Sequence, residues 1–395
     1  MKIKQFIFGI ILFVIFYLEP IYLGPLKFAH LWKIPVLLYL LFSVKFKIKK
    51  DKITKYSFLY YIKYLLTTGI IYFGYLTDGF LMMVRGISIP IIFNFLNVKN
   101  YEQQKLVKFL TFVSDFIIIS SIPFLANLIQ PLGRGYELDN YGLESIDGYV
   151  GIFQNAHGAA IITSQALLVK LFFVIRNKRF SIFNILLTAI GFLALYQTYV
   201  RTGYVMFFIG FLIIVYLEYG IKRFYKLIPI LGILIIVVFY LFTNDSALRG
   251  RVTQQNIYRQ NQELTIDQIS SGRLTLSLVN LQSYWESDML TKLLGMGVQY
   301  STDEMNDKIG MRKMSHNGFV DALVHTGILG FIFYILFLKM ILKIIRKNKH
   351  SAFYSLGLAS FFSFLLFILF QGGNVFLLEV QLLVIIILLK NKIET

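Results

Sequence analysis

Long apolar runs, bounded by charged or turn-forming residues, follow one another along the whole chain. Such runs are typical of helices that cross a membrane, which need about 20 predominantly apolar residues each. They occupy residues 3–18, 31–44, 58–77, 79–98, 106–130, 151–175, 180–198, 202–219, 224–242, 317–341, 351–371 and 374–390. The pattern predicts an all-α polytopic membrane protein with about 12 transmembrane helices, forming a single integral membrane domain over residues 1–395.

The composition agrees with this fold class. Hydrophobic residues make up 57% of the chain and charged residues 15%, whereas an ordinary soluble domain carries roughly 25% charged residues. These values exclude a soluble globular enzyme and a disordered chain. The chain has no cysteine, which excludes disulfides, thiolate metal sites and cysteine catalysis. The first run lacks an A-x-A-like cleavage site, so we expect it to be retained as a helix.

The basic residues alternate from loop to loop and therefore predict the orientation. The net charge is +18, and Lys and Arg cluster at 45–52, 176–179, 221–226 and 343–350. The intervening loops are poor in Lys and Arg. Because short cytoplasmic loops collect these residues, we expect both termini in the cytoplasm and an even number of spans. Basic cytoplasmic loops thus explain the excess of positive charge, and we expect no nucleic-acid partner.

One connection is much longer than the others. Residues 243–316, between the ninth and tenth runs, contain eight Lys or Arg and eight Asp or Glu residues, and the alternation places them outside the cytoplasm. Within this loop, residues 270–285 predict an amphipathic helix, capped by Ser270 or Ser271. Its apolar face carries Leu274, Leu278, Leu281 and Trp285. Such a helix either lies on the outer membrane interface or packs on the end of the bundle.

No motif for nucleotide or metal chemistry occurs in the chain. There is no phosphate loop, dinucleotide fingerprint, HExxH or GxSxG sequence. The five histidines are scattered without ligand spacing. We therefore expect neither a cofactor nor a metal ion, and any chemistry must use Arg, His, Asp and Glu near the outer surface.

Four arginines are candidates for binding an anion. Arg201 opens the eighth run, and Arg85 lies seven residues into the fourth run, about 10 Å deep in a helix. An arginine within a span costs about 2.5–3.5 kcal/mol and usually faces a cavity or an anion. Snorkelling to the headgroups is the alternative for both. Arg273 and Arg249 lie in the long loop, where an ordinary surface role is the alternative. Together the four predict a collector for anionic headgroups, since guanidinium binds phosphate through two parallel hydrogen bonds.

Histidines and a carboxylate lie near the same predicted side. His316 directly precedes the tenth run, which begins at Asn317, and imidazole accepts a proton near neutral pH. The alternative is that His316 only neighbours a helix cap. Asp321 and His325 follow four residues apart, so they share a helix face. His157 opens the sixth run.

Four local patterns, in order, resemble one family. They are GIFQNAHGAA at 151–160, RTGYVMFFIGF at 201–211, SGRLTLSLVNLQSYWESDMLTKLLGMG at 271–297 and HNGFVDALVHTGILG at 316–330. The set is similar to the motifs of the O-antigen ligase and polymerase superfamily, which includes Wzy-type polymerases of polysaccharide repeat units. The resemblance covers about residues 150–330. His157 stands where the family often has Asn, and His325 where it often has Glu.

The resemblance implies glycosyl transfer outside the membrane. The donor would be a polyprenyl-pyrophosphate-linked oligosaccharide and the acceptor a sugar hydroxyl, without a cofactor. Arg201 and Arg273 are then expected to neutralise the departing pyrophosphate, and His316 to take the hydroxyl proton. Direct displacement would invert the anomeric centre. The expected substrate-binding residues are Arg85, His157, Asn317, Asp321 and Arg249.

Three functions remain in competition. A polymerase joins lipid-linked repeat units of a capsule, O-antigen or exopolysaccharide, whereas a ligase moves the finished glycan to lipid A core or protein. The Lys-, Phe- and Tyr-rich composition suits a capsule producer without lipid A and favours the polymerase. A flippase or transporter would need cations along its whole cavity, yet here they cluster outside. The expected location is the bacterial cytoplasmic membrane with the site facing outward. The expected partners are polyprenyl-pyrophosphate-linked oligosaccharides, membrane lipids, and the flippase and chain-length regulator of the pathway.

Overall fold

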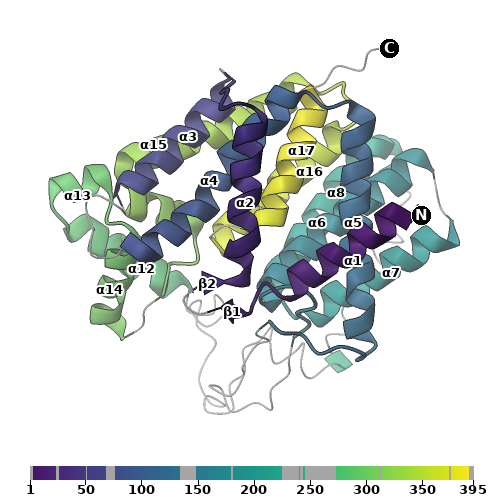
Figure 1. Cartoon of the computed structure of the whole chain (residues 1–395), viewed down its shortest axis with the longest axis horizontal. Helices are drawn as coiled ribbons and strands as arrows, with labels where there is room; N and C mark the ends of the chain where they lie inside the picture. Colours follow the sequence, from purple (N-terminus) through teal and green to yellow (C-terminus); the bar gives the residue numbers. More distant parts are fainter. Residues whose placement is uncertain are drawn as a thin grey trace. The chain divides into compact units, whose positions relative to one another are not determined.

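The described residues of this computed structural model are almost entirely helical (Figure 1). They are residues 3–23, 26–49, 51–67, 76–133, 148–178, 181–224, 240, 243–244, 273–310, 313–372 and 375–390. The helices up to the long loop are α1 (Ile3–Tyr17), α2 (Phe28–Ser43), α3 (Lys52–Leu66), α4 (Leu76–Lys99), α5 (Gln103–Leu125), α6 (Ala156–Asn177), α7 (Ile182–Gln197) and α8 (Arg201–Phe224). Those that follow are α12 (Arg273–Glu286), α13 (Met289–Leu294), α14 (Val298–Ile309), α15 (Gly318–Lys347), α16 (Tyr354–Phe370) and α17 (Phe376–Lys390). A short hairpin pairs β1 (Tyr22–Leu23) with β2 (Leu26–Lys27).

Four described helices are long and apolar enough to cross a membrane: α5, α6, α15 and the part of α8 up to Gly220. Together with the shorter apolar helices, they make the chain an all-α membrane protein. Helices α1 to α8 and α15 to α17 each correspond to one predicted apolar run. The predicted start of the third run, residue 58, is wrong, since α3 begins at Lys52, where Asp51 caps the helix by accepting a hydrogen bond from the Thr54 amide at 3.0 Å. The predicted run at 224–242 lies almost entirely outside the described residues, and the total of 12 spans stays a prediction.

The predicted start of the sixth run is wrong by five residues. Residues 151–155 form turns, and α6 begins at Ala156. Asn155 is the reason, because its side-chain oxygen accepts a hydrogen bond from the Gly158 amide at 2.8 Å and so caps the helix. Gly151, with a φ of 60°, turns the chain just before the cap. Hydropathy alone could not separate these buried turn residues from the helix.

The chain divides into two compact units. The first comprises residues 1–29, 108–269 and 358–363, and the second comprises residues 30–107, 270–357 and 364–395. Helices α5 and α16 contribute residues to both units. The single-domain organisation stays a prediction.

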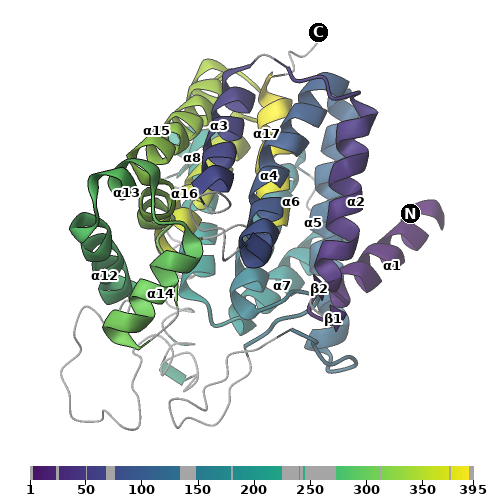
Figure 2. The same cartoon turned by 60° about the vertical axis from the view of Figure 1, so that its left-hand side comes forward.

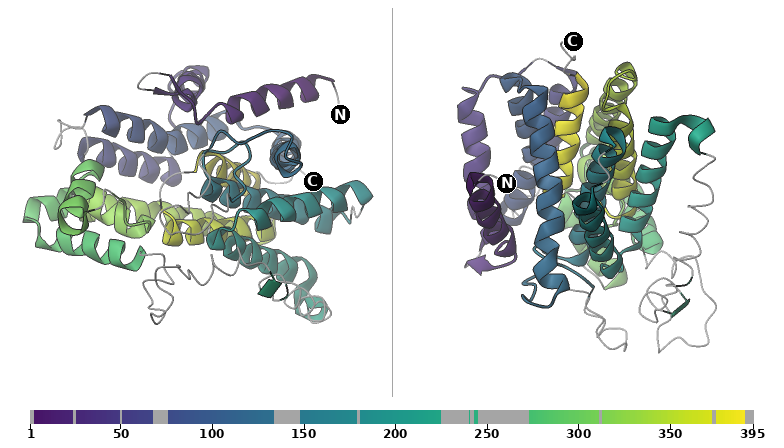
Figure 3. Two further views of the ribbon diagram at one scale, coloured as in Figure 1. Left: turned by 90° about the horizontal axis from the view of Figure 1, so that it is seen from below. Right: turned by 90° about the vertical axis from the view of Figure 1, so that its right-hand side faces the viewer.

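In the first unit, α6 and α8 pack closely against each other (Figure 3, in which α6, α7 and α8 are the teal helices). A side chain at Gly203 would meet Ala160, and one at Gly210 would meet Leu168, so contacts advance along both helices in the same direction. The Ser164 hydroxyl donates to the Gly203 carbonyl at 2.7 Å. The two helices therefore begin at the same end of the unit.

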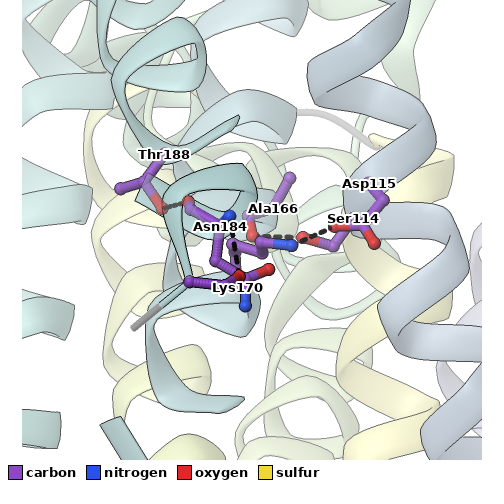
Figure 4. A network of polar contacts seen from close by, with 7 residues as sticks. Ser114, Asp115, Ala166, Lys170, Asn184 and Thr188 are labelled. Carbon is purple, nitrogen blue, oxygen red and sulfur yellow. Dashed lines mark hydrogen bonds and ion pairs between the residues drawn. The ribbon is translucent and has the colours of Figure 1, made fainter. Parts of the chain in front are cut away.

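A buried ion pair joins α5 to α6 in this unit (Figure 4). Lys170 donates to the Asp115 carboxylate at 2.7 Å, and only 6% of the lysine side chain is exposed. One residue away, the Ser114 hydroxyl donates to the Ala166 carbonyl. A lysine inside an apolar helix is costly without a partner, so Asp115 explains how α6 accommodates Lys170.

In the second unit, α3 and α15 run antiparallel side by side (Figure 2). The rings of Tyr60 and Tyr334 lie 4.8 Å apart, and Lys63 packs at Gly330. The start of α3 therefore lies at the end of α15.

The helix termini at that end of the second unit are basic. Asn97, near the end of α4, accepts hydrogen bonds from Lys390 at 2.7 Å and from Lys49 at 3.0 Å. Helix α15 ends in Arg346 and Lys347. We call this the basic end of the second unit.

Candidate functional site

The site is built on the turn that starts α15, at the opposite end of α15 from its basic terminus. Asn317 caps the helix, with its side-chain oxygen accepting from the amides of Phe319 at 3.1 Å and Val320 at 3.3 Å. One turn into the helix, Asp321 accepts hydrogen bonds from the hydroxyl of Ser315 at 2.6 Å and its amide at 3.2 Å. These contacts hold Ser315 and Asn317 in place, the two residues that flank His316.

His316 itself adopts a left-handed backbone conformation, with a φ of 55°. This region is uncommon for residues other than glycine, although histidine enters it more readily than most. Backbone strain of this kind costs of order 1–3 kcal/mol and persists only where neighbouring contacts enforce it. The hydrogen bonds of Ser315 and Asn317 supply that enforcement.

Arg273, the first residue of α12, binds the end of α16. Its guanidinium donates to the Phe370 carbonyl and to the Gln371 side-chain oxygen, the latter at 3.5 Å. A cation at the carboxyl end of a helix is favoured by the helix dipole. The Gln371 backbone also hydrogen-bonds with His316. Two of the three predicted catalytic residues thus converge on Gln371.

Glycines allow the end of α16 to meet the start of α15. A side chain at Gly372 would come within 2.9 Å of an Asp321 oxygen and 3.2 Å of the Gly318 amide. Gly372 also has a φ of 63°. A side chain at Gly318 would meet Ile368 at 2.9 Å. The close approach keeps Gln371 beside the His316 turn.

Several groups set the protonation of His316. Burial lowers the pKa of its imidazole, and the nearby charges of Arg273 and Lys313 lower it further. The Asp321 carboxylate and the hydrogen bond with Gln371 act in the opposite direction, but the net pKa lies below the ordinary value. His316 is therefore neutral near pH 7. An imidazole that donates one N–H to a carbonyl keeps its other nitrogen as a proton acceptor.

This arrangement brings a cation from α12 together with a neutral base at the amino terminus of α15. The amino end of α15 favours negative charge, as does the Arg273 guanidinium. Both suit an anionic leaving group, and neutral His316 suits the deprotonation of a hydroxyl. We call Arg273, His316, Asp321 and Gln371 the α15 site.

Residues 293–297, which form the L-x-G-x-G segment at the end of α13, dock on a break in α15. At Gly327 the helix is interrupted, with φ 66° and ψ −176°. The amides of Met296 and Gly297 donate to the carbonyls of Val324 and His325 at 2.7 and 3.1 Å. The L-x-G-x-G segment therefore binds helix carbonyls that the break exposes.

The glycines of this segment are required by the same contact. A side chain on Gly295 would meet the Gly327 amide at 2.5 Å, and one on Gly327 would meet the Gly295 amide at the same distance. On the far side of the segment, Lys63 and Thr67 of α3 both donate to the Leu294 carbonyl, Thr67 at 2.8 Å. The segment is thus clamped between α3 and α15.

The other predicted residues fall elsewhere. Arg201 begins α8 and His157 lies at the start of α6, so both belong to the first unit, at the same end of the parallel α6–α8 pair. Arg85 lies on α4, but its side chain is outside the described residues, as is the whole of Arg249. His325 is 4% exposed and lies near the Tyr64 ring.

Sequence reasoning missed Gln371, which both Arg273 and His316 contact. A signal existed, since the polar pair Gln371–Gly372 ends an otherwise apolar run. The sequence analysis also did not foresee that the side-chain oxygen of Asn317 caps α15. The predicted substrate-binding role of Asn317 stays a prediction, one that the amide nitrogen would have to serve.

Comparison with known protein families identifies the region that holds this geometry. Residues 185–335 match the model of a family described as O-antigen ligase. This part of the chain is therefore similar to the O-antigen ligase family. The resemblance to the O-antigen ligase and polymerase superfamily is thereby confirmed. No curated protein matches the chain.

The matched region runs from α7 into α15 and includes Arg201, Arg273, His316 and Asp321. Members of that family are glycosyltransferase-type membrane enzymes that act on lipid-linked glycans. His157 and Gln371 lie outside the matched residues.

Proposed function

We propose that this protein polymerises lipid-linked oligosaccharide repeat units on the outer face of the cytoplasmic membrane. The observation that carries the proposal is the convergence of Arg273 and His316 on Gln371 at the start of α15. The donor brings its own leaving group, a polyprenyl pyrophosphate. The protein then needs to supply only charge stabilisation and a base.

In the proposed reaction, the hydroxyl oxygen of the acceptor sugar attacks the anomeric carbon of the donor. The bond from that carbon to the pyrophosphate oxygen breaks, and the lipid pyrophosphate leaves with its electron pair. His316 takes the hydroxyl proton, while Arg273 neutralises the charge that develops on the pyrophosphate. A single displacement of this kind inverts the anomeric centre. Arg201 keeps the catalytic role that the family resemblance implies for it.

The distribution of charge within the second unit supports the proposed sidedness. Lys49, Lys390, Arg346 and Lys347 lie at the basic end, which the positive-inside rule assigns to the cytoplasm. The α15 site lies at the other end of α15. The topology with 12 spans, cytoplasmic termini and residues 243–316 outside belongs to this proposal.

The test uses purified protein and one substrate, the lipid-linked repeat unit, as both donor and acceptor. We expect long polymer from the wild type, none from Arg273→Ala and a reduced yield from Arg273→Lys, because an ammonium cannot bind phosphate through two parallel hydrogen bonds. The matched control is Arg346→Ala, which removes an exposed arginine at the basic end, and this variant should form polymer normally.

The same assay separates the competing functions. A ligase would give no product until lipid A core or an acceptor protein is added. A flippase would move the lipid-linked repeat across vesicle membranes without lengthening it. Either result would replace the polymerase proposal.

A further inference from the structure

We propose that α13 is a re-entrant helix, which carries the long loop back into the outer half of the bilayer and contacts lipid acyl chains there. The identification of that half as the outer one rests on the proposed function and its topology. The embedding itself rests on two helices that measure depth, on the exposed apolar side chains of α13, and on the hydrogen bonding of the segment that follows it.

Helix α15 gives the first measure of depth. The docked segment meets α15 at Gly327, and the basic terminus of α15 begins at Lys343. The sixteen residues between them span about 24 Å of helix. The hydrocarbon core is about 30 Å thick, so Gly327 lies about 6 Å inside its far boundary. Tilting of the helix would place it deeper.

Helix α3 gives an independent measure. Lys55 is the last basic residue before its apolar stretch, and Thr67 binds the Leu294 carbonyl at the end of α13. The twelve residues from Lys55 to Thr67 span about 18 Å. This places Leu294 about 12 Å inside the same boundary. Both helices therefore put the carboxyl end of α13 within the hydrocarbon layer.

The exposed side chains of α13 suit that position. Met289, Leu290 and Leu293 are 79%, 64% and 40% exposed. On α15, large exposed apolar side chains appear only from Ile328 onward, directly after the docking point. They are Ile328, Leu329, Ile332 and Ile335. The exposed apolar side chains of α13 therefore lie next to the point at which α15 begins to expose its own.

The backbone amides and carbonyls that follow α13 have hydrogen-bond partners in the protein, which an intramembrane segment requires. Irregular chain at this depth persists only where protein groups pair its amides and carbonyls. The Leu294 carbonyl accepts from Lys63 and Thr67, and the amides of Met296 and Gly297 donate to α15. Lys63, a lysine well inside α3, thereby gains a partner from the loop.

The first test uses the fluorescence of a single tryptophan, placed in a protein from which both native tryptophans have been removed. The chain has two tryptophans and no cysteine. In a Trp32→Phe/Trp285→Phe protein, Leu290→Trp places one fluorophore on α13, and Asp307→Trp places one on the exposed face of α14 as control. We expect brominated acyl chains to quench the α13 fluorophore and aqueous iodide to quench the α14 fluorophore. Iodide quenching of both, without bromolipid quenching at position 290, would overturn the proposal.

A second measurement does not depend on tryptophan substitution. Leu290→Cys and Asp307→Cys are treated with a membrane-impermeant maleimide, which needs a hydrated thiol. We expect labelling at 307 and at least a tenfold slower reaction at 290. Equal rates would place α13 in water, and protection at 290 without bromolipid quenching would place a protein partner on it. Both results contradict re-entry. Neither readout requires glycosyl transfer, so failure of the polymerase proposal leaves this test intact.

Discussion

At the scale of single residues, the backbone of His316 decides which substitution is informative. Its φ of 55° strains any alanine placed there, so His316→Ala would combine a folding defect with the loss of the imidazole. Asparagine enters the left-handed region readily and keeps hydrogen-bonding capacity. His316→Asn therefore removes proton acceptance while it preserves the turn.

We expect His316→Asn to lower kcat by about 10²–10⁴-fold, the usual contribution of a general base, with an unchanged melting temperature. His316→Ala should lose the same activity and also melt earlier. The measurements are polymer formation at saturating lipid-linked repeat and thermal unfolding in detergent. An Asn variant within a few-fold of wild-type kcat would remove the general-base role and leave the reaction to the arginines.

The neighbours of His316 predict the pH dependence. The Asp321 carboxylate raises the pKa of His316 and the Lys313 ammonium lowers it. A base must be deprotonated to work, so activity falls as pH drops through this pKa. Asp321→Asn should therefore move the acid limb of kcat/KM to lower pH, and Lys313→Gln should move it slightly to higher pH. Superimposable profiles for all three proteins would show that another group controls the limb.

The sequence was informative about residue types but not about their partners. Arg273 and His316 could be chosen because guanidinium and imidazole suit the chemistry of a pyrophosphate leaving group. Gln371 could not, because its role depends on the end of α16 meeting Arg273, which lies 98 residues earlier in the chain. The sequence did not show that the side-chain oxygen of Asn317 caps α15, and the substrate-binding role of Asn317 stays a prediction.

At the scale of elements, Gly327 is the clearest case in which a motif residue has a packing role. The family-like H-N-…-G-x-x-G pattern marks this glycine without giving a reason. The structure provides two reasons, the positive φ and the contact with the Gly295 amide.

Gly327→Ala should destabilise the protein more than Gly220→Ala. Both glycines adopt a backbone conformation that other residues rarely enter, with φ 66° and ψ −176° at Gly327 and φ 68° and ψ 168° at Gly220. Each alanine therefore carries a similar backbone strain of order 1–3 kcal/mol. Only at Gly327 would the new side chain also meet Gly295 and Leu293 at 2.5 Å. We expect a larger loss of melting temperature and a loss of polymerisation for Gly327→Ala alone. Equal effects of the two substitutions would show that the docked segment tolerates displacement from α15.

At the scale of the whole molecule, hydropathy located the helices because burial in lipid and burial in protein both demand apolar residues. It could not locate their ends, since caps such as Asn155 follow buried turns that are equally apolar. Nor could it show that 243–316 contains a segment docked on α15. That contact depends on glycines at 295 and 327, which hydropathy treats as neutral.

The sidedness of the protein is tested by reporter fusions that are active only outside the cytoplasm. We expect activity after Gln260 and none after Lys50, Asn177 or Asn348, because basic loops flank the last three positions. The Asn177 fusion is the most consequential. Helices α6 and α8 run parallel, so if α6 ends inside, His157 and Arg201 both begin their helices outside. An active reporter at Asn177 would place these two residues in the cytoplasm, where they could not reach a donor on the outer face.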